Sequence, residues 1–269
     1  MSKCLVTKLK ASVNNPNLPV FGEFVINVNY DISNAHELDC IRFYSHNTAI
    51  LPNGTEITKE NLESSISFKN DVQQPGKIII KDKYNGLLYI NIEGPGTTNN
   101  VTFDWADLKY SNLYGINITG VVNTTSSILD CGKHEETTTL NLLNTKMSNI
   151  KFKDIALNFP NITKQNLGNS SIVCDDIKDI ALWTKLNPDS VFFMNENCFS
   201  GNLYDAVVEW RKTSKSPSQK IYCFRNTNIF LFDTLCKGKS FKLEWTDTTA
   251  SVTIDDVKTT YDNNGNVIS

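Results

Sequence analysis

The sequence lacks the segments that mark exported and membrane-spanning proteins and the pairs of cysteines that bind metals. Residues 1–15 contain no apolar stretch typical of a signal peptide, and no apolar run approaches the roughly 18 residues of a membrane-spanning helix. The seven cysteines include no C-x-x-C pair and their number is odd, which argues against a disulfide framework or a zinc site. We therefore expect reduced, mostly buried thiols and no membrane span.

Clustered positive charge and catalytic motifs are absent as well. The net charge is -3 and Lys and Arg are scattered, so we expect no nucleic-acid partner. None of the three histidines has a second histidine at ligand spacing, and His134 lies beside two glutamates in a segment that we assign to a hydrophilic loop. No nucleophile elbow, phosphate-binding loop or dinucleotide-binding turn occurs. The sequence thus predicts no enzymatic activity, no cofactor and no bound metal.

Asparagine is unusually abundant, and it takes part in an internal repeat. The tetrapeptide DIAL stands at residues 154–157 and again at 179–182. Similar segments recur at comparable steps before and after it. They are INIEG (90–94), INITG (116–120), LNLLNTKM (140–147), QNLGNSSI (165–172), VFFMNENC (191–198) and YCFRNTNI (222–229).

Each repeated segment reads as a short strand, a turn and a return segment. The central apolar residues are Ile92, Ile118, Leu142, Leu167, Phe193 and Phe224, and only Gly or Asn stands two positions after each of them. Gly and Asn turn a chain most readily through positive φ, so a turn is predicted there. Twelve positions after the first five central residues stand Asp104, Asp130, Asp154, Asp179 and Asp205. An Asp at that place would cap a short helix or turn.

These segments resemble leucine-rich repeats, in an irregular form with Thr or Ser where the usual pattern has Asn. Thr145, Ser170 and Thr227 occupy that position, whereas Pro95, Val121 and Glu196 depart from it. Single units of this kind cannot bury their apolar edges, but stacked units share a continuous core. We therefore predict a mainly β fold with short helices, in which a leucine-rich-repeat-like solenoid with a period of about 25 spans residues 86–238.

Both ends of the chain depart from the period. Residues 1–85 contain short alternating or β-branched runs broken by turn signals such as Asn53-Gly54, which predicts a small N-terminal β domain for attachment or capping. Residues 239–269 alternate strongly and contain the turn signal at Asp262–Gly265, which predicts a C-terminal β hairpin cap.

The N-terminal segment CLVTKLKASVNNPNLPVFGEF (4–24) resembles the opening of small Asn-rich proteins from gut Bacteroides and their crAss-like bacteriophages. Several of these are virion components that carry leucine-rich repeats. The resemblance implies a virion structural protein, a head or tail fibre subunit or a decoration protein, assembled in the cytoplasm of a bacterial host. It would contact other virion proteins through the N-terminal domain, could form homo-oligomers, and could bind a glycan or protein on the host surface.

The residues between the inward-facing strand positions predict a binding surface. One column contains amides, Asn91, Asn117, Asn141 and Asn166, and continues to Phe192; its neighbour includes Leu143 and Met194. The amides could bind a partner or stabilise each other along the stack. An exposed patch around Phe192 and Met194 is the stronger candidate, and Phe192→Asp would then abolish association without unfolding the chain.

Two other functions fit the same pattern. The first is a bacterial leucine-rich-repeat adhesin or interaction module outside any virus. The second is a carbohydrate-active solenoid enzyme, which would need two carboxylates close together on one face. Among the first five predicted strands only Glu93 is a carboxylate that we place on the strand face.

Overall fold

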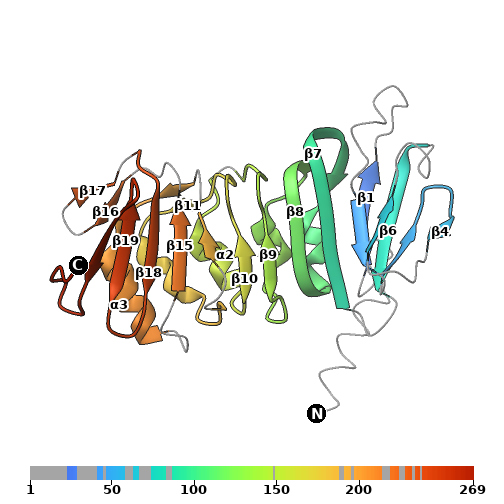
Figure 1. The fold of residues 1–269 in the computed structure, drawn as a ribbon. Coiled ribbons are helices and arrows are strands. Elements are labelled where there is room, and N and C mark those ends of the chain that lie inside the picture. The colour runs from blue at the N-terminus through green and yellow to red at the C-terminus, as the bar shows by residue number, and fades with distance from the viewer. Residues whose placement is uncertain are drawn as a thin grey trace, which may run out of the picture. The chain divides into compact units, whose positions relative to one another are not determined.

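The protein is mainly β, with a few short helices (Figure 1). The computed structural model describes residues 23–28, 41–44, 47–57, 63–66, 74–82, 87–147, 149–187, 191–194, 197–213, 219–223, 228–231, 234–236 and 238–269. The chain forms two compact units. Unit 1 comprises Met1–Gly115 and Val121–His134, and unit 2 comprises Ile116–Gly120 and Glu135–Ser269.

Unit 1 contains six described strands within residues 23–82, where short alternating or β-branched runs predict a β domain, and a seventh, Leu87–Phe103, in the part of the chain assigned to the solenoid. They are β1 (Glu23–Val28), β2 (Ile41–Tyr44), β3 (Asn47–Ile50), β4 (Glu56–Ile57), β5 (Glu63–Ile66), β6 (Gly76–Asp82) and β7 (Leu87–Phe103). β1 lies antiparallel between β6 and β7, with Ile26 opposite Ile78, and both side chains are buried. The turn expected at Asn53-Gly54 is confirmed, because Gly54 has φ of 84° and the Asn53 side chain accepts from the Thr55 amide. Residues 4–22, which carry the resemblance to phage proteins, lie outside the described residues.

The first two repeated segments do not turn where the pattern predicts. Gly94 lies inside β7, and Gly120 lies inside β8 (Asn112–Thr124), so the chain stays extended through both glycines. Inward burial of Ile92 and Ile118 is confirmed. A glycine in a strand is compatible with extended pairing. Gly120 stands between the β-branched residues Thr119 and Val121, which favour a strand.

The repeated aspartates lie at the starts of helices, although only one of them is the capping residue. The relevant helices are η2 (Trp105–Tyr110), η3 (Ile128–Cys131), α2 (Phe152–Asn158), η4 (Ile177–Leu182) and α3 (Leu203–Thr213). Asp104 caps η2 and accepts from the Ala106 amide (2.9 Å). A hydrogen bond from Ser126 is the main cause that lowers the pKa of Asp104. Asp130, Asp154, Asp179 and Asp205 instead stand inside the first turn, where the positive end of the helix dipole favours a carboxylate.

Unit 2 contains parallel strands at the predicted spacing. Its strands are β9 (Thr139–Asn141), β10 (Lys164–Asn166), β11 (Val173–Cys174), β12 (Val191–Phe193), β13 (Cys198–Phe199), β14 (Gly201–Asn202), β15 (Gln219–Cys223), β16 (Ile229–Leu231), β17 (Thr234–Leu235), β18 (Phe241–Trp245), β19 (Ala250–Ile254) and β20 (Val257–Tyr261). Asn141 pairs with Asn166 in the β9–β10 ladder, and Val173 pairs with Cys198 in the β11–β13 ladder. Both pairs join residues that are separated by the same step as the two DIAL copies. β12 pairs with β15, also in parallel.

The turns after β9 and β10 use asparagine as predicted. Asn144 and Asn169 stand two positions after Leu142 and Leu167, and their φ values are 61° and 50°. The two turns are also bonded to each other, because Asn169 Nδ2 donates to Asn144 Oδ1 at 2.9 Å. The same turn chemistry thus recurs on adjacent strands.

The two DIAL copies occupy equivalent places in α2 and η4. Ile155 and Ile180 are both fully buried, whereas the leucines that end the two copies, Leu157 and Leu182, are exposed. Trp183 follows the second copy, is fully buried, and donates from Nε1 to the carbonyl oxygen of Phe159 (2.8 Å). The helices therefore bury one side against the core that the inward-facing strand residues form.

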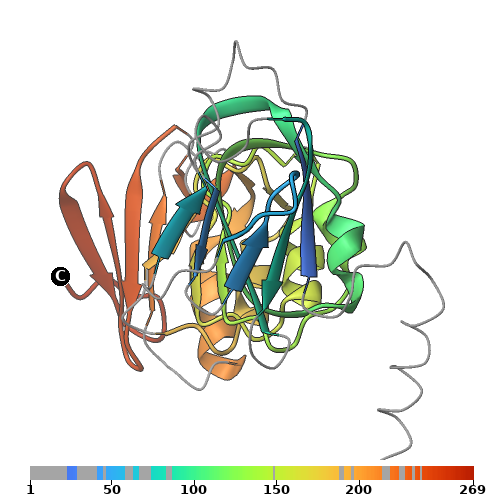
Figure 2. The ribbon, with the colours of Figure 1, turned by 90° about the vertical axis from the view of Figure 1, so that its right-hand side faces the viewer.

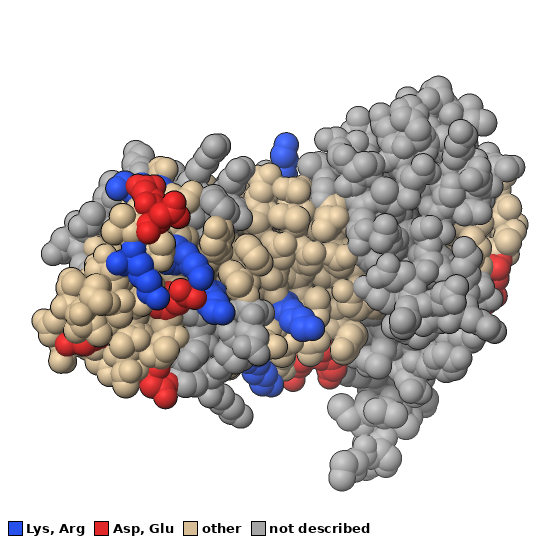
Figure 3. All heavy atoms as spheres, viewed as in Figure 1, with Lys and Arg blue, Asp and Glu red and all other residues tan. Residues whose placement is uncertain are grey.

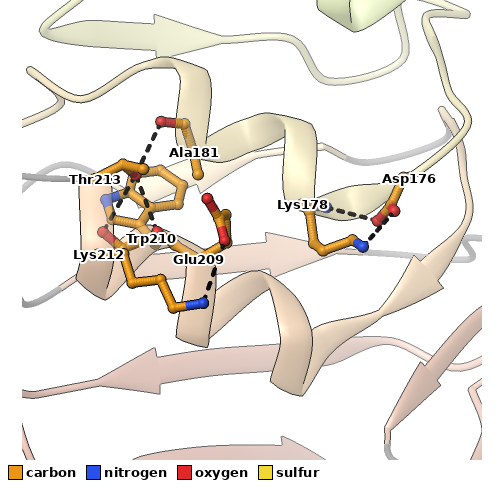
Figure 4. A network of polar contacts seen from close by, with 7 residues as sticks. All are labelled: Asp176, Lys178, Ala181, Glu209, Trp210, Lys212 and Thr213. Carbon is orange, nitrogen blue, oxygen red and sulfur yellow. Dashed lines mark hydrogen bonds and ion pairs between the residues drawn. The ribbon is translucent and has the colours of Figure 1, made fainter.

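α3 packs next to η4 and holds the core at the C-terminal side of unit 2. The hydroxyl of Thr213, in the last turn of α3, lies 3.3 Å from the carbonyl oxygen of Ala181 (Figure 4). On its other side, the buried ring of Trp210 meets Trp245 of β18 edge to face, with centroids 5.3 Å apart. In the view of Figure 2, α3 (orange) lies to one side of the orange-red strands β18, β19 and β20.

The C-terminal residues form three antiparallel strands rather than a single hairpin. β18 pairs with β15, β19 with β18, and β20 with β19, so the antiparallel strands continue the parallel β12–β15 pair (Figure 1). The turn expected at Asp262–Gly265 is present, since the Gly265 amide donates to the Asp262 carbonyl oxygen (3.1 Å). It joins β20 to the last residues of the chain in antiparallel fashion, because Tyr261 and Val267 form an antiparallel bridge and the Ile268 amide donates to the Thr260 carbonyl oxygen (2.8 Å).

Arg211 of α3 holds two turns of this antiparallel segment. Its Nε donates to the carbonyl oxygen of Thr246 (2.9 Å), its Nη2 to that of Thr249 (2.6 Å), and its Nη1 to Asn263 Oδ1 (2.8 Å). These bonds use the planar fork of the guanidinium, which places several donors at fixed angles.

Replacing Arg211 with Ala is expected to lower the free energy of unfolding of unit 2 by about 2 kcal/mol, because three acceptors lose a charged donor. Arg211→Lys should recover little of this loss, since one ammonium cannot reach all three acceptors. Urea denaturation followed by circular dichroism measures the effect. The control is Lys212→Ala, which removes an exposed contact of 3.7 Å to Glu209. Equal losses in R211A and K212A would contradict the role of Arg211.

The described cysteines differ sharply in exposure. Cys198 is exposed, while Cys131 and Cys174 are buried. Burial raises the pKa of the Cys131 thiol to about 12, and burial also raises the pKa of Cys174. Because the thiolate is the reactive form, iodoacetamide at mildly alkaline pH should label Cys198 at least about a hundredfold faster than the other two. Peptide mass mapping measures the three rates, which should become similar in denaturant. Similar rates in the native protein would contradict the burial.

Candidate functional site

The most extended candidate surface in unit 2 is the side of its strands that points away from the core, which we call the strand face. β9 and β10 belong to one sheet and β12, β15, β18, β19 and β20 to another, and the Leu167 amide donates to the Phe193 carbonyl oxygen between them (3.3 Å). Its side chains form two rows that run across the strands. The first row is Asn141, Asn166, Phe193, Tyr222, Lys242, Thr253 and Lys258. The second row is Thr139, Lys164, Val191, Lys220, Glu244, Ser251 and Thr260. Inward-facing neighbours such as Leu140 and Leu243 are fully buried, so the two sides of the strands are distinct.

The predicted amides lie on this face where the structure describes them. Asn141 and Asn166 are partly exposed and directly opposite each other, and Leu143 is partly exposed just beyond β9. Asn117 of β8 is also partly exposed between the buried Ile116 and Ile118, whereas the side chain of Asn91 lies outside the described part of the chain.

Asn141 and Asn166 bond to their own turns rather than to each other. Asn141 Oδ1 accepts from the Leu143 amide (3.2 Å), and Asn166 Oδ1 accepts from the Gly168 amide (3.1 Å). Each is an Asx turn that ends its strand. The ladder of amides that we considered for this column is therefore not formed by these two side chains.

The predicted exposed patch at Phe192 and Met194 is wrong, because both side chains are fully buried. Phe192 lies among aromatic residues of the core, with its ring centroid 5.9 Å from that of Phe152 and 6.0 Å from that of Trp183. A side chain enclosed in this way cannot contact a partner. Phe193 points outward instead, so the central residue assigned to the fifth unit was displaced by one position.

The error arises from extra residues between the later strands. The equivalent buried positions are Leu140, Gln165, Phe192 and Ile221. The step from Leu140 to Gln165 equals that between the DIAL copies, and each later step is longer than the one before it. The sequence analysis took Phe193 and Phe224 as the central residues of the fifth and sixth repeats. Both repeats were therefore aligned one residue out of register with the strands before them. A slip of one residue exchanges the two sides of a strand.

The structure places an aromatic pair on the strand face that the sequence analysis missed. Phe193 and Tyr222 are directly opposite on β12 and β15, and both are partly exposed. Their ring centroids lie 6.3 Å apart, and the rings are tilted by 59°. The sequence signal was the alternation in KIYCF, where Tyr222 follows an apolar residue that belongs to the core.

Charged side chains gather beside the aromatic pair. Lys242 stands opposite Tyr222, and Lys220 stands opposite Glu244. Lys242 Nζ also lies 2.9 Å from Glu244 Oε1. Figure 3 shows basic (blue) and acidic (red) side chains over β15 and β18, and a surface with few charges over β9 and β10. The strand face thus has an amide end, an aromatic centre and a charged end.

The strand face does not offer paired carboxylates for acid and base catalysis. Within its two described rows, Glu244 is the only carboxylate; it forms an ion pair with Lys242 and stands opposite Lys220 on the neighbouring strand. Among the residues that the structure describes, no group of three His, Cys, Asp or Glu side chains could hold a metal ion. His134 is buried, and its Nε2 lies 3.0 Å from the Cys131 carbonyl oxygen.

Comparisons with known proteins give no further guide. No family model, no curated protein and no solved structure matches the chain. Within the described part of the chain, none of the helices has both the length and the apolar character to cross a membrane.

Proposed function

We propose that the chain is a non-enzymatic interaction protein in which unit 2 is a leucine-rich-repeat-like solenoid that presents the strand face to a partner. The observation that carries this proposal is the parallel pairing, in two separate ladders, of residues separated by the step of the DIAL copies. Proteins built from stacked units use the extended surface of their strands for binding, because that surface is rigid and grows with each unit.

A column of polar side chains near the ends of the strands supports the comparison with leucine-rich repeats. Thr145 and Ser170 stand three positions after Leu142 and Leu167, and each donates its hydroxyl to the carbonyl oxygen of that leucine. In the corrected register the next residue of the column is Asn197, three positions after Met194. Asn is the residue that the usual leucine-rich-repeat pattern has at this position. With Asn197 there in place of Glu196, the fifth repeat fits the pattern better.

Asn197 also links two adjacent repeats within unit 2. Its Nδ2 donates to the Leu167 carbonyl oxygen (2.7 Å), and its Oδ1 accepts from the Ile172 amide (3.0 Å). A buried amide in this position satisfies backbone groups that the turn leaves without strand partners. This arrangement of hydrogen bonds suits a stack of repeats.

Within this class we propose a bacteriophage virion component, a fibre or decoration subunit assembled in the cytoplasm of its host. The proposal rests on the resemblance of the segment 4–24 to Asn-rich proteins of gut Bacteroides and their phages. The N-terminal β strands would contact other virion proteins, and the strand face would remain available to a partner or to another copy of the chain. A bacterial adhesin and a carbohydrate-active enzyme are the alternative functions.

Mass spectrometry of purified phage particles from a lysed culture that expresses the chain tests this proposal. We expect the protein at stoichiometric levels relative to known capsid or tail subunits. Its absence from particles, with the protein retained in cells or envelope, would favour the adhesin. Turnover of a glycan by the pure protein would contradict a non-enzymatic role.

A further inference from the structure

We propose that the strand face binds an acidic polysaccharide, a chain of sugar rings that carry carboxylate or sulfate groups. This inference rests on the proposed function, because it names the partner class of the same surface. The aromatic pair Phe193–Tyr222 would contact the sugar rings, and the lysines of the adjacent strands would contact the anionic groups.

The charge of the strand face differs in sign from that of the whole chain. Its two rows contain four lysines, Lys164, Lys220, Lys242 and Lys258, and one carboxylate, Glu244. The chain as a whole has a net charge of -3. A locally positive surface on an acidic protein attracts anions to that surface and repels them elsewhere, which favours binding in one place.

The aromatic pair suits sugar rings. The faces of a pyranose ring present C–H groups, which pack against the negatively polarised faces of aromatic rings. Phe193 and Tyr222 are partly exposed, and the tilt of 59° between their rings prevents the two from covering each other completely. A sugar chain that crosses the strands would therefore meet apolar surface at this point.

Polar groups on both sides of the aromatic pair suit sugar hydroxyls. Asn166 lies on the neighbouring strand beyond Phe193, and because its Oδ1 accepts from the Gly168 amide, its Nδ2 is the group that can donate to a ligand. On the other side, Thr253 stands opposite Lys242 in the same row. Along the row, amide groups are followed by aromatic rings and then by ammonium and hydroxyl groups. Such a mixture recognises sugars through several weak contacts.

A nucleic acid fits this surface less well. Nucleic-acid sites combine aromatic platforms with many cationic contacts to closely spaced phosphates. The described rows contain no arginine, and one of the central lysines, Lys242, is paired with Glu244. A polysaccharide with one anionic group on each ring or on alternate rings matches the sparse lysines better.

Binding of the purified full chain to polygalacturonate and heparin, with dextran as the neutral control and oligothymidylate as the nucleic-acid control, tests the inference. We expect binding to the acidic polysaccharides that weakens with added salt, and none to dextran. The double variant Lys164→Gln/Lys220→Gln should bind about tenfold more weakly, since two of the four positive charges of the strand face are lost. Tyr222→Ala should weaken binding by a similar factor.

The matched control is Lys153→Gln/Lys185→Gln, which removes the same charge from two exposed lysines outside the strand face and should leave binding unchanged. Thermal melting of every variant verifies folding. Equal weakening by both double variants, tighter binding to oligothymidylate, or salt-independent binding to dextran would overturn the inference. A chain that binds no glycan but is stoichiometric in phage particles would overturn the inference and leave the proposed function in place.

Discussion

Phe192→Asp is expected to unfold unit 2, whereas Phe193→Asp leaves it folded. Phe192 is fully buried and meets the rings of Phe152 and Trp183. Removing a buried phenylalanine costs about 3–5 kcal/mol, and an unpaired carboxylate in its place adds several more. The sum is comparable with the whole stability of an ordinary domain, about 5–15 kcal/mol.

Phe193→Asp provides the matched control, because it makes the same change one position away. Its side chain is partly exposed on the strand face, so we expect a loss of at most about 1 kcal/mol. Circular dichroism melting curves and limited proteolysis of the two variants measure the difference. If F193D unfolds and F192D stays folded, the register of β12 is wrong by one residue, and Phe192 rather than Phe193 belongs to the strand face.

Asn197→Ala is expected to lower the free energy of unfolding of unit 2 by about 3 kcal/mol. The side chain is only 3% exposed; its Nδ2 donates to the Leu167 carbonyl oxygen, and its Oδ1 accepts from the Ile172 amide. The variant leaves the Ile172 amide buried without this acceptor, and an unsatisfied buried group costs about 1–3 kcal/mol. The space that the amide vacates adds to the loss.

Asn166→Ala is the control for Asn197→Ala. Asn166 is partly exposed and its side chain closes one Asx turn at 3.1 Å, so we expect a loss of about 0.5–1 kcal/mol. Denaturation in urea gives both values. A loss at Asn197 no larger than that at Asn166 would show that the polar column contributes little to the stack, and would weaken the comparison with leucine-rich repeats.

The interior of the repeat was predictable where apolar and polar residues alternate. In LNL (140–142) and QNL (165–167) the first and third residues face the core, so the asparagine between them points outward. Leu142 and Leu167 are buried as expected. The step between these two leucines is the same as that between the DIAL copies and between the asparagines that turn the chain. Local propensity and burial agree at these positions, so pattern and structure agree as well.

The candidate surface was less predictable, because VFFM has apolar residues at four successive positions. Alternation cannot say which pair faces the core, and the choice depends on pairing with β10 and β15. For the same reason the aromatic centre of the strand face, Phe193 and Tyr222, was overlooked. The turns expected at Gly94 and Gly120 are absent for another reason. Both glycines lie in long strands, where strand pairing overrides the preference of glycine for turns.

The sequence by itself determined the mainly β composition, the step that separates the DIAL copies, the asparagine turns and the aspartates at the starts of helices. These features depend on residues close together in the chain or on direct repetition of a segment. Only the tertiary structure decided the register of β12 and β15, the burial of Phe192 and Met194, and the rows that cross the strands. Each depends on hydrogen bonds between residues far apart in the chain, and loops of variable length between them leave no periodic signal in the sequence.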